Sequence, residues 1–246
     1  MIQLPQPRFI LVEPSHPGNI GAVARAMKTM NFNELVLVNP QRYPSAEATA
    51  RAAGADDVLA CARVVDSLAA ALVGCVWVVG SSARPRSLPW PTLEPRAAAG
   101  TVARELASGA VALVFGRERS GLSNEELGLC HALLSIPANP DYSSLNLAAA
   151  VQLVAYEVRL GLREAAPPSA AEPDEIPAGS DEMEGLFRHL ESTLAQIGFL
   201  DPANPRQLMA KLRRLYNRAR PTQSEVNILR GILTETGKNR AKIDPR

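Results

Sequence analysis

Residues 9–38 read FILVEPSHPGNIGAVARAMKTMNFNELVLV and set a pattern that most of the chain follows. The segment has two short apolar runs rich in β-branched residues, 9–13 and 34–38, with a helical-looking stretch at 18–31 between them. Apolar runs of this length are typical of fully buried strands. A strand, a helix and a second strand in succession predict two parallel strands joined by a crossover helix.

The same alternation continues to about residue 163. Further strands are predicted at 75–79, 110–115 and 133–136, and further helices at 66–73, 97–108, 123–130 and 145–163. Ser143 or Ser144 is a candidate N-cap for the last helix. The alternation predicts an α/β domain whose parallel sheet is covered by helices on both faces.

A change of composition marks the end of this domain. The stretch from Glu164 to Glu182 reads EAAPPSAAEPDEIPAGSDE, which combines Pro, Ala and acidic residues and has little to bury. We therefore divide the chain into an α/β domain at 1–163, a linker at 164–180 and a helical extension at 181–246.

Three short helices are predicted in the extension. The first carries an apolar stripe at helical spacing, formed by Phe187, Leu190, Leu194 and Ile197. The second begins near Pro205 with Asn204 as its N-cap. The third begins at the capping box Thr222-x-x-Glu225 and ends at Gly237. Three helices have little independent stability, so we expect them to pack on another surface, such as a second subunit.

Charge is distributed unevenly along the chain, although the formal net charge is only +1. Residues 1–180 hold 14 Lys and Arg against 17 Asp and Glu, whereas residues 181–246 hold 12 against 8. A basic surplus in the extension favours a negatively charged partner such as nucleic acid.

The cysteines and the apolar runs indicate the compartment. Cys61, Cys75 and Cys130 form no C-x-x-C pair and no His cluster accompanies them, so neither a disulfide framework nor a zinc site is predicted. No apolar run reaches membrane-spanning length, and the N-terminus lacks the features of an export signal. We expect a protein of the reducing cytoplasm with no membrane partner.

Missing motifs exclude several enzyme classes. No G-x-G-x-x-G follows the first strand and no G-x-x-x-x-G-K-[ST] occurs, which disfavours dinucleotide and ATP enzymes. No G-x-S-x-G or H-E-x-x-H occurs either, and the three His lie far apart in sequence. A hydrolase therefore has little support.

Four polar segments, rich in Gly and Ser, follow predicted strands at 15–25, 80–90, 116–126 and 136–146. In open α/β sheets, ligands bind at the carboxyl ends of the strands. Each segment alone also has the composition of an ordinary strand-to-helix turn, so a purely structural role stays open for each. The combination of all four, in this order, is more specific.

Together these segments contain three motifs that resemble those of the SpoU branch of the SPOUT RNA 2'-O-methyltransferases. The motifs are N-x-G-A-x-x-R at 19–25, F-G-x-E-x-x-G-L at 115–122, and I-P at 136–137 with S-L-N at 144–146. The resemblance covers about residues 8–163. Arg117 departs from the pattern, because many members of this branch have Asn at that place.

The resemblance implies a homodimeric enzyme that binds S-adenosylmethionine (SAM), needs no metal and methylates a ribose 2'-hydroxyl of RNA. It also implies that the α/β domain ends in a trefoil knot, which few folds contain. The segments RAMKTM, PWP and KLRRLYNRARP narrow the resemblance to enzymes that methylate cytidine or uridine at nucleotide 32 of the tRNA anticodon loop. We therefore expect tRNA as the partner.

By the same correspondence, the cofactor site is implied to consist of Ser81, Ser82, Ala83, Gly116, Ile136, Ser143, Ser144 and Leu145. In this interpretation Gly116 allows close approach of the ligand, and Ile136 covers the adenine face.

The catalytic group implied by the resemblance consists of Arg25, Ser144, Asn19, Asn146, Glu118 and Arg117. A guanidinium is not deprotonated in proteins, so we interpret Arg25 as a clamp on a substrate phosphate that orients the ribose. Ser144 and Asn146 then complete the hydrogen-bond shell. Asn19 shapes its loop or supports Arg25, and Glu118 orients Arg25 or Arg117. A solvated helix face is the alternative for Arg25, and a surface ion pair is the alternative for Glu118.

Six basic residues of the extension are predicted to contact RNA phosphates: Arg206, Lys211, Arg213, Arg214, Arg218 and Arg220. No acidic residue lies between 206 and 224. A solvated helix face is the alternative interpretation. Aromatic residues make up only 4% of the chain, which disfavours recognition by extended base stacking.

Two other functions remain open at this point. The motifs do not specify the RNA, so the same chemistry on ribosomal RNA is one alternative. The other is a SAM- and RNA-binding scaffold without turnover, which the intact Asn19, Arg25, Ser144 and Asn146 disfavour.

Overall fold

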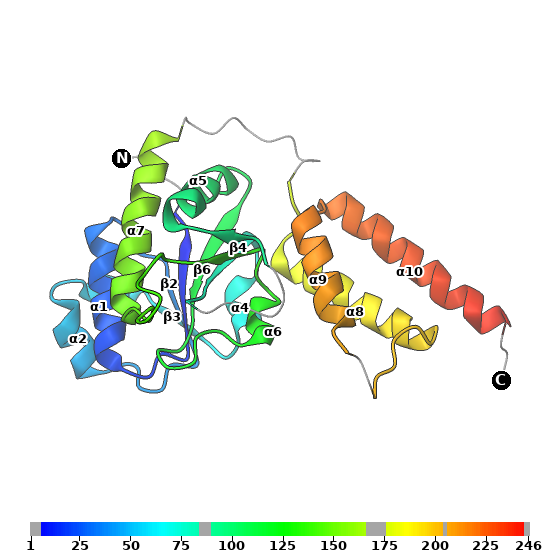
Figure 1. Ribbon diagram of the computed structural model, residues 1–246, viewed down its shortest axis with the longest axis horizontal. Helices are drawn as coiled ribbons and strands as arrows, with labels where there is room; N and C mark the ends of the chain where they lie inside the picture. Colours follow the sequence, from blue (N-terminus) through cyan, green and yellow to red (C-terminus); the bar gives the residue numbers. More distant parts are fainter. Residues whose placement is uncertain (1–5, 84–89, 166–175, 204–205, 244–246) are drawn as a thin grey trace. The chain divides into compact units, whose positions relative to one another are not determined.

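The computed structural model of the protein (Figure 1) describes residues 6–83, 90–165, 176–203 and 206–243. The chain divides into two compact units, Met1–Ala170 and Ala171–Arg246. Each unit has its own apolar core.

The first unit is built on a parallel sheet of seven strands, in the order β3-β2-β1-β6-β4-β7-β5. The strands are β1 (Arg8–Val12), β2 (Leu35–Val38), β3 (Arg63–Val65), β4 (Cys75–Ser81), β5 (Thr92–Leu93), β6 (Ala110–Phe115) and β7 (Ala132–Leu134). The α/β architecture with a parallel sheet is therefore confirmed.

Seven helices accompany these strands in the described part of the first unit. They are α1 (Pro17–Thr29), α2 (Ala46–Ala52), α3 (Asp56–Ala60), α4 (Leu68–Leu72), α5 (Pro95–Glu105), α6 (Asn124–Leu127) and α7 (Leu147–Glu164). In Figure 1, α1 and α7 run alongside each other over the sheet.

Alternate residues of each central strand enter two separate cores. In β1, Phe9 and Leu11 pack with α1, α2, α5 and α7, whereas Ile10 and Val12 pack with α4 and α6 on the opposite face. All four side chains are buried. Period-two alternation with apolar residues on both faces explains why the strands read as continuous apolar runs.

The structure differs from the predictions at short elements and at one helix cap. The strands β3 and β5 and the helices α2 and α3 were not predicted, because two to seven residues carry too little periodicity. The prediction that Ser143 or Ser144 caps α7 is wrong. Asn146 is the N-cap, and its side-chain oxygen accepts hydrogen bonds from the backbone N–H of Ala148 (2.9 Å) and Ala149 (3.4 Å).

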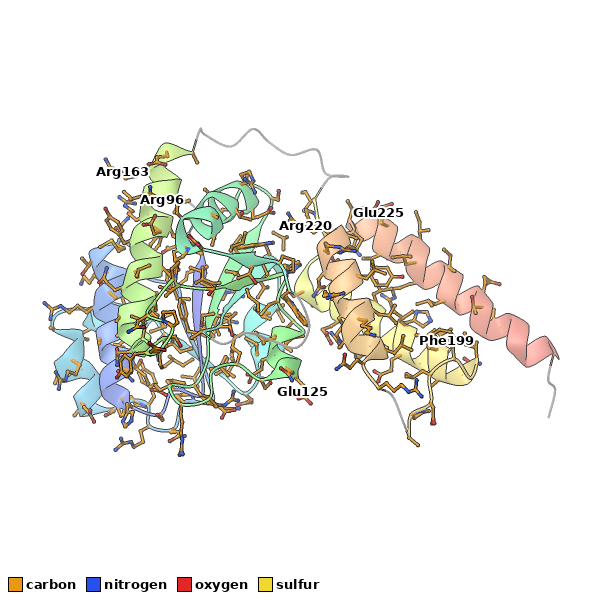
Figure 2. The ribbon with its side chains drawn as sticks, in the orientation of Figure 1. Arg96, Glu125, Arg163, Phe199, Arg220 and Glu225 are labelled. Atoms are coloured by element: carbon orange, nitrogen blue, oxygen red, sulfur yellow. The ribbon has the colours of Figure 1, made fainter. Side chains whose placement is uncertain are left out.

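The second unit contains α8 (Ser180–Gln196), α9 (Leu208–Ala219) and α10 (Gln223–Ile243). Their core consists of Ala178, Met183, Leu186, Phe187 and Val226, and Tyr216 of α9 packs against it as a partly buried side chain. The predicted capping box of α10 is confirmed by hydrogen bonds that Thr222 and Glu225 exchange over 2.8 and 3.3 Å. Glu225 is labelled in Figure 2. The prediction that this helix ends at Gly237 is wrong, because it continues to Ile243. The predicted cap Asn204 and Pro205 lie outside the described residues.

Among the described helices, none combines the length and the apolar character that a membrane span requires.

Candidate functional site

A cavity of about 150 Å³ lies at the carboxyl ends of β4, β6 and β7. These strands are parallel neighbours in the sheet, so their carboxyl ends meet at one edge. Ser81, Phe115 and Leu134, the last residues of the three strands, all line the cavity. This is the position at which parallel α/β sheets bind ligands.

The cavity brings together the eight residues predicted to form a cofactor site: Ser81, Ser82, Ala83, Gly116, Ile136, Ser143, Ser144 and Leu145. They come from three segments that are far apart in sequence: the end of β4, the turn after β6 and the connection between β7 and α7. The structure also places Arg117 and Glu118 on the cavity wall. Arg119, Ser120, Gly121, Leu147 and Ala150 complete the lining, and these were not predicted.

The carboxylate of Glu118 is held by the loop between β1 and α1. It accepts hydrogen bonds from the backbone N–H of Ser15 (3.1 Å) and His16 (3.3 Å), from the Ser15 hydroxyl (2.9 Å) and from Asn19 Nδ2 (3.0 Å). His16 is the N-cap of α1 and its side chain makes no capping hydrogen bond. Glu118 therefore supplies the negative charge that a helix N-terminus favours.

Burial alone would raise the pKa of Glu118, but the hydrogen bonds from Asn19 and Ser15 lower this pKa to about 2. The carboxylate is therefore ionised throughout the neutral pH range. We had predicted that Glu118 orients Arg25 or Arg117, whereas its hydrogen bonds within the described residues go to Ser15, His16 and Asn19.

Asn19 connects Glu118 to the N-terminus of α7. Its Nδ2 donates to Glu118, and its Oδ1 accepts a hydrogen bond from Asn146 Nδ2 over 3.1 Å. The oxygen of Asn146 is engaged in capping α7. The structure thus ties the three sequence motifs together through side chains, and the amides of Asn19 and Asn146 serve to hold loops in place.

Arg117 makes ion pairs with two carboxylates. Its guanidinium lies 2.6 Å from Glu13 Oε1 and 2.9 Å from Glu126 Oε1. Hydrogen bonds with Glu13 and then with Glu126 raise the pKa of Arg117, and the hydrogen bond from Arg117 lowers the pKa of Glu13. Glu13 and Glu126 were not predicted, since no motif links acidic residues so far apart in sequence.

Two motif glycines are required by backbone packing. A Cβ at Gly116 would lie 2.3 Å from the carbonyl carbon of Gly121, and a Cβ at Gly21 would lie 2.0 Å from the carbonyl oxygen of Ala48. Side chains cannot be accommodated at such distances. Gly116 therefore lets its own loop close; it also lines the cavity, and close approach of a ligand to it stays a prediction.

Arg25 is exposed on α1 and does not line the cavity. Within the described part of the chain, its guanidinium makes no ion pair or hydrogen bond. It is thus available for a partner outside the chain.

The six basic residues of the second unit differ in their surroundings. Arg206, Lys211 and Arg218 are exposed, and Arg214 and Arg220 are half-buried. Arg213 forms an ion pair with Glu184, and its guanidinium carbon lies 4.5 Å from the ring centre of Phe187. Arg213 therefore stabilises the second unit itself.

Across the described residues, His, Cys, Asp and Glu nowhere form a group of three that could hold a metal ion. The cavity lining is instead a mixture of hydroxyl groups, apolar side chains and the charged residues Arg117, Glu118 and Arg119.

Both the α/β domain and the helical extension of the chain match known protein families. Residues 6–156 match the SpoU rRNA methylase family, and residues 181–244 match the C-terminal domain of the tRNA methyltransferase TrmJ. A tRNA (cytidine/uridine-2'-O-)-methyltransferase TrmJ from Pectobacterium atrosepticum is 55% identical over 232 residues, which cover 94% of this chain and 96% of the relative.

Two further relatives agree with these matches. A tRNA (cytidine/uridine/adenosine-2'-O-)-methyltransferase TrmJ from Pseudomonas aeruginosa is 53% identical, with 94% of this chain and 93% of the relative covered. The crystal structure of TrmJ from Z. mobilis superposes with a TM-score of 0.82 at 36% identity, and covers 94% of this chain and 98% of that one.

Proposed function

Since this chain belongs to the TrmJ family of SpoU methyltransferases, we propose that it transfers a methyl group from SAM to a ribose 2'-hydroxyl of tRNA, on a cytidine or uridine at nucleotide 32. The observation that carries the proposal is the cavity at the ends of β4, β6 and β7, because the family's motif residues converge on it.

The cavity lining fits SAM in its chemistry. Phe115, Leu134 and Ile136 provide an apolar wall for a purine ring, and Ser82 and Ser144 provide hydroxyls for ribose and amino-acid groups.

SAM supplies a methyl group on a sulfonium centre, so positive charge is dispersed during transfer. The protein's main task is then to hold the reacting groups in line, which can contribute roughly 7–11 kcal/mol. Rigid loops suit this task. The hydrogen bonds among Glu118, Asn19 and Asn146 fix the loops that border the cavity.

We assign the contact with the target nucleotide to Arg25 and Ser144. The exposed guanidinium of Arg25 would bind the phosphate next to the target ribose, because guanidinium and phosphate pair through two parallel hydrogen bonds. Ser144 is exposed at the cavity and would orient the ribose. Arg25 does not act as a base in this proposal, since a guanidinium retains its proton. As the 2'-oxygen bonds to the methyl carbon and the carbon–sulfur bond breaks, the hydroxyl proton would pass to water and the demethylated cofactor would leave as a neutral thioether.

We propose that residues 1–163 bind SAM, that 164–180 form a linker, and that 181–246 bind tRNA phosphates. The exposed Lys211 and Arg218 are seven residues apart on α9, which places them on one face of the helix. With Arg206, Arg214 and Arg220 they give a basic surface. Arg213 contributes less, because Glu184 already holds it.

Three further properties complete the proposal. The family implies a homodimer, and Leu153 and Tyr156 leave apolar side chains exposed on α7 for such a contact. It also implies that the chain after β6 is threaded as a trefoil knot. An enzyme of tRNA modification would act in the cytoplasm.

The test is methyl transfer from tritium-labelled SAM to tRNA transcripts. We expect label in a transcript with ribose at nucleotide 32 and none in a matched transcript with 2'-deoxyribose there. Equal labelling of both transcripts would contradict the assigned nucleotide, and no labelling of either would contradict the activity.

A further inference from the structure

The turn after β6 is closed upon itself and forms one wall of the cavity. Arg117 and Gly121 exchange backbone hydrogen bonds of 3.3 and 2.9 Å, and Gly121 has a φ of +69°. All residues from Arg117 to Gly121 line the cavity. Arg119 and Ser120, at the tip, are exposed. An exposed turn of this kind keeps a fixed position in the cavity wall only if other parts of the protein contact it.

The side chain of Arg117 provides that support on two sides. Its Nε and one terminal nitrogen donate to the two oxygens of Glu13 over 2.9 and 2.6 Å. Its two terminal nitrogens donate to the two oxygens of Glu126 over 2.9 Å each. Both pairs are therefore bidentate, an arrangement that a guanidinium can make and an ammonium group cannot.

The two carboxylates belong to different parts of the first unit. Glu13 directly follows β1, and its backbone N–H donates to the carbonyl of Val38 over 2.8 Å. Glu126 lies in α6 and completes a capping box by accepting from the backbone N–H of Ser123 over 2.7 Å. The turn is thus braced against the sheet on one side and against a helix on the other.

Geometry makes this cluster stronger than an ordinary surface ion pair, because both pairs are bidentate. The side chains of Arg117, Glu126 and Glu13 are 27%, 16% and 39% exposed, so the cluster is only partly shielded from water. Loss of Arg117 would leave two carboxylates facing one another, whereas loss of either carboxylate would leave two of the four hydrogen bonds of the guanidinium to these partners unmade.

The turn 117–121 and the loop after β1 stabilise each other. Glu13 from the loop after β1 holds Arg117, and Glu118, the next residue of the turn, holds Ser15 of that same loop. Movement of either loop would therefore disturb the other, and with it the hydrogen bond from Glu118 to Asn19.

We propose that Arg117, Glu13 and Glu126 are positioning residues that set the turn 117–121 for SAM binding. The inference rests on the proposed function, because it takes the cavity to be the SAM site. None of the three charged groups takes part in the reaction. Neutralising either carboxylate weakens SAM binding while the reaction of the bound complex is largely kept.

The test compares Glu13→Gln and Glu126→Gln with the wild-type full chain. The matched control is Glu157→Gln, because Glu157 is 19% exposed and pairs with Arg96 at 3.2 Å but does not line the cavity or touch the turn. Calorimetry gives the dissociation constant for SAM, steady-state kinetics give kcat and the KM for SAM, and thermal unfolding reports stability.

We expect Glu13→Gln to raise the dissociation constant and the KM for SAM by about tenfold, with kcat at saturating SAM changed by less than about threefold. Glu126→Gln should act in the same direction, although it also weakens the cap of α6. Glu13→Asp keeps the charge and should restore part of the affinity, while Glu157→Gln should bind SAM as the wild type does.

Unchanged SAM affinity in Glu13→Gln and Glu126→Gln would overturn the inference and leave the cluster a purely structural brace. A fall in kcat with an unchanged KM would overturn it as well. Failure of the wild-type chain to bind SAM would instead contradict the proposed function, so the two failures are distinguishable.

Discussion

Asn146 donates a hydrogen bond of 3.1 Å to Asn19, and this contact joins the N-terminus of α7 to the first turn of α1. The two residues are 127 positions apart in sequence. Asn19 also donates to Glu118, so the contact extends to the turn that lines the cavity. The proposed site is thus held by a side-chain network whose members come from the first turn of α1, the turn after β6 and the N-terminus of α7.

Replacing Arg25 should separate cofactor binding from catalysis. Arg25 lies outside the cavity lining, so Arg25→Ala should leave the dissociation constant for SAM unchanged and lower methylation by about 100-fold through loss of substrate orientation. Lys28→Ala is the control, since Lys28 is also exposed on α1 but pairs with Asp57 at 2.8 Å. If both variants methylate tRNA at the wild-type rate, Arg25 is an ordinary surface residue.

Shortening Ile136 should weaken SAM binding specifically. Ile136→Ala removes apolar contact from the cavity wall, which corresponds to about 1–2 kcal/mol or about tenfold in affinity. The affinity for tRNA should not change. Val64→Ala removes an exposed apolar side chain of β3, away from the cavity, and should leave SAM binding intact. Equal SAM affinities of Ile136→Ala and the wild type would place the cofactor elsewhere.

Glu118 should make the first unit sensitive to acid. Its folded-state pKa of about 2 lies below the ordinary 4.5, so its contribution to stability is complete above that ordinary value and is lost as the pH falls towards 2. Glu118→Gln should therefore lower the free energy of unfolding near neutral pH, and the difference from the wild type should shrink between about pH 5 and pH 3.

Urea unfolding at several pH values measures this difference. Glu125→Gln removes an exposed carboxylate of α6 and serves as the control (Figure 2). A difference between Glu118→Gln and the wild type that stays constant with pH would show that the carboxylate charge is not what stabilises the loop.

The basic face of α9 should determine how tRNA binding responds to salt. The double variant Lys211→Ala, Arg218→Ala should reduce the slope of log affinity against log salt by about 2, since each phosphate contact contributes about 1. Lys28→Ala again serves as the control. Arg213→Ala should instead lower the melting temperature, because it removes the contacts with Glu184 and Phe187. An unchanged slope in the double variant would assign tRNA binding to another surface.

The sequence allowed the main strands and helices to be predicted, because buried strands and amphipathic helices have distinct periodicities. It also supplied the residues that converge on the cavity. The partners of Arg117 and Glu118 could not be predicted, since side-chain pairs between distant loops leave no local pattern. The partner of Arg213 could not be predicted either. Its basic neighbours in the sequence suggested a phosphate contact, whereas in the structure it pairs with Glu184 beside the core of the second unit.

The packing partners of the motif glycines could not be predicted from the sequence either. A glycine in a ligand-binding motif suggests room for a ligand, whereas Gly116 and Gly21 are each pressed against backbone of the protein itself. A sequence pattern indicates that a side chain is excluded at such a position, but the neighbour that excludes it becomes known only from the fold.

The most direct test of the account is a map of ribose methylation in total RNA from cells that contain the chain and from cells that lack it. We predict that the 2'-O-methyl group at nucleotide 32 of tRNA disappears in cells lacking the chain, that the wild-type chain restores it, and that Arg25→Ala does not. Unchanged tRNA methylation, together with a missing methyl group on a ribosomal RNA ribose, would contradict tRNA as the substrate.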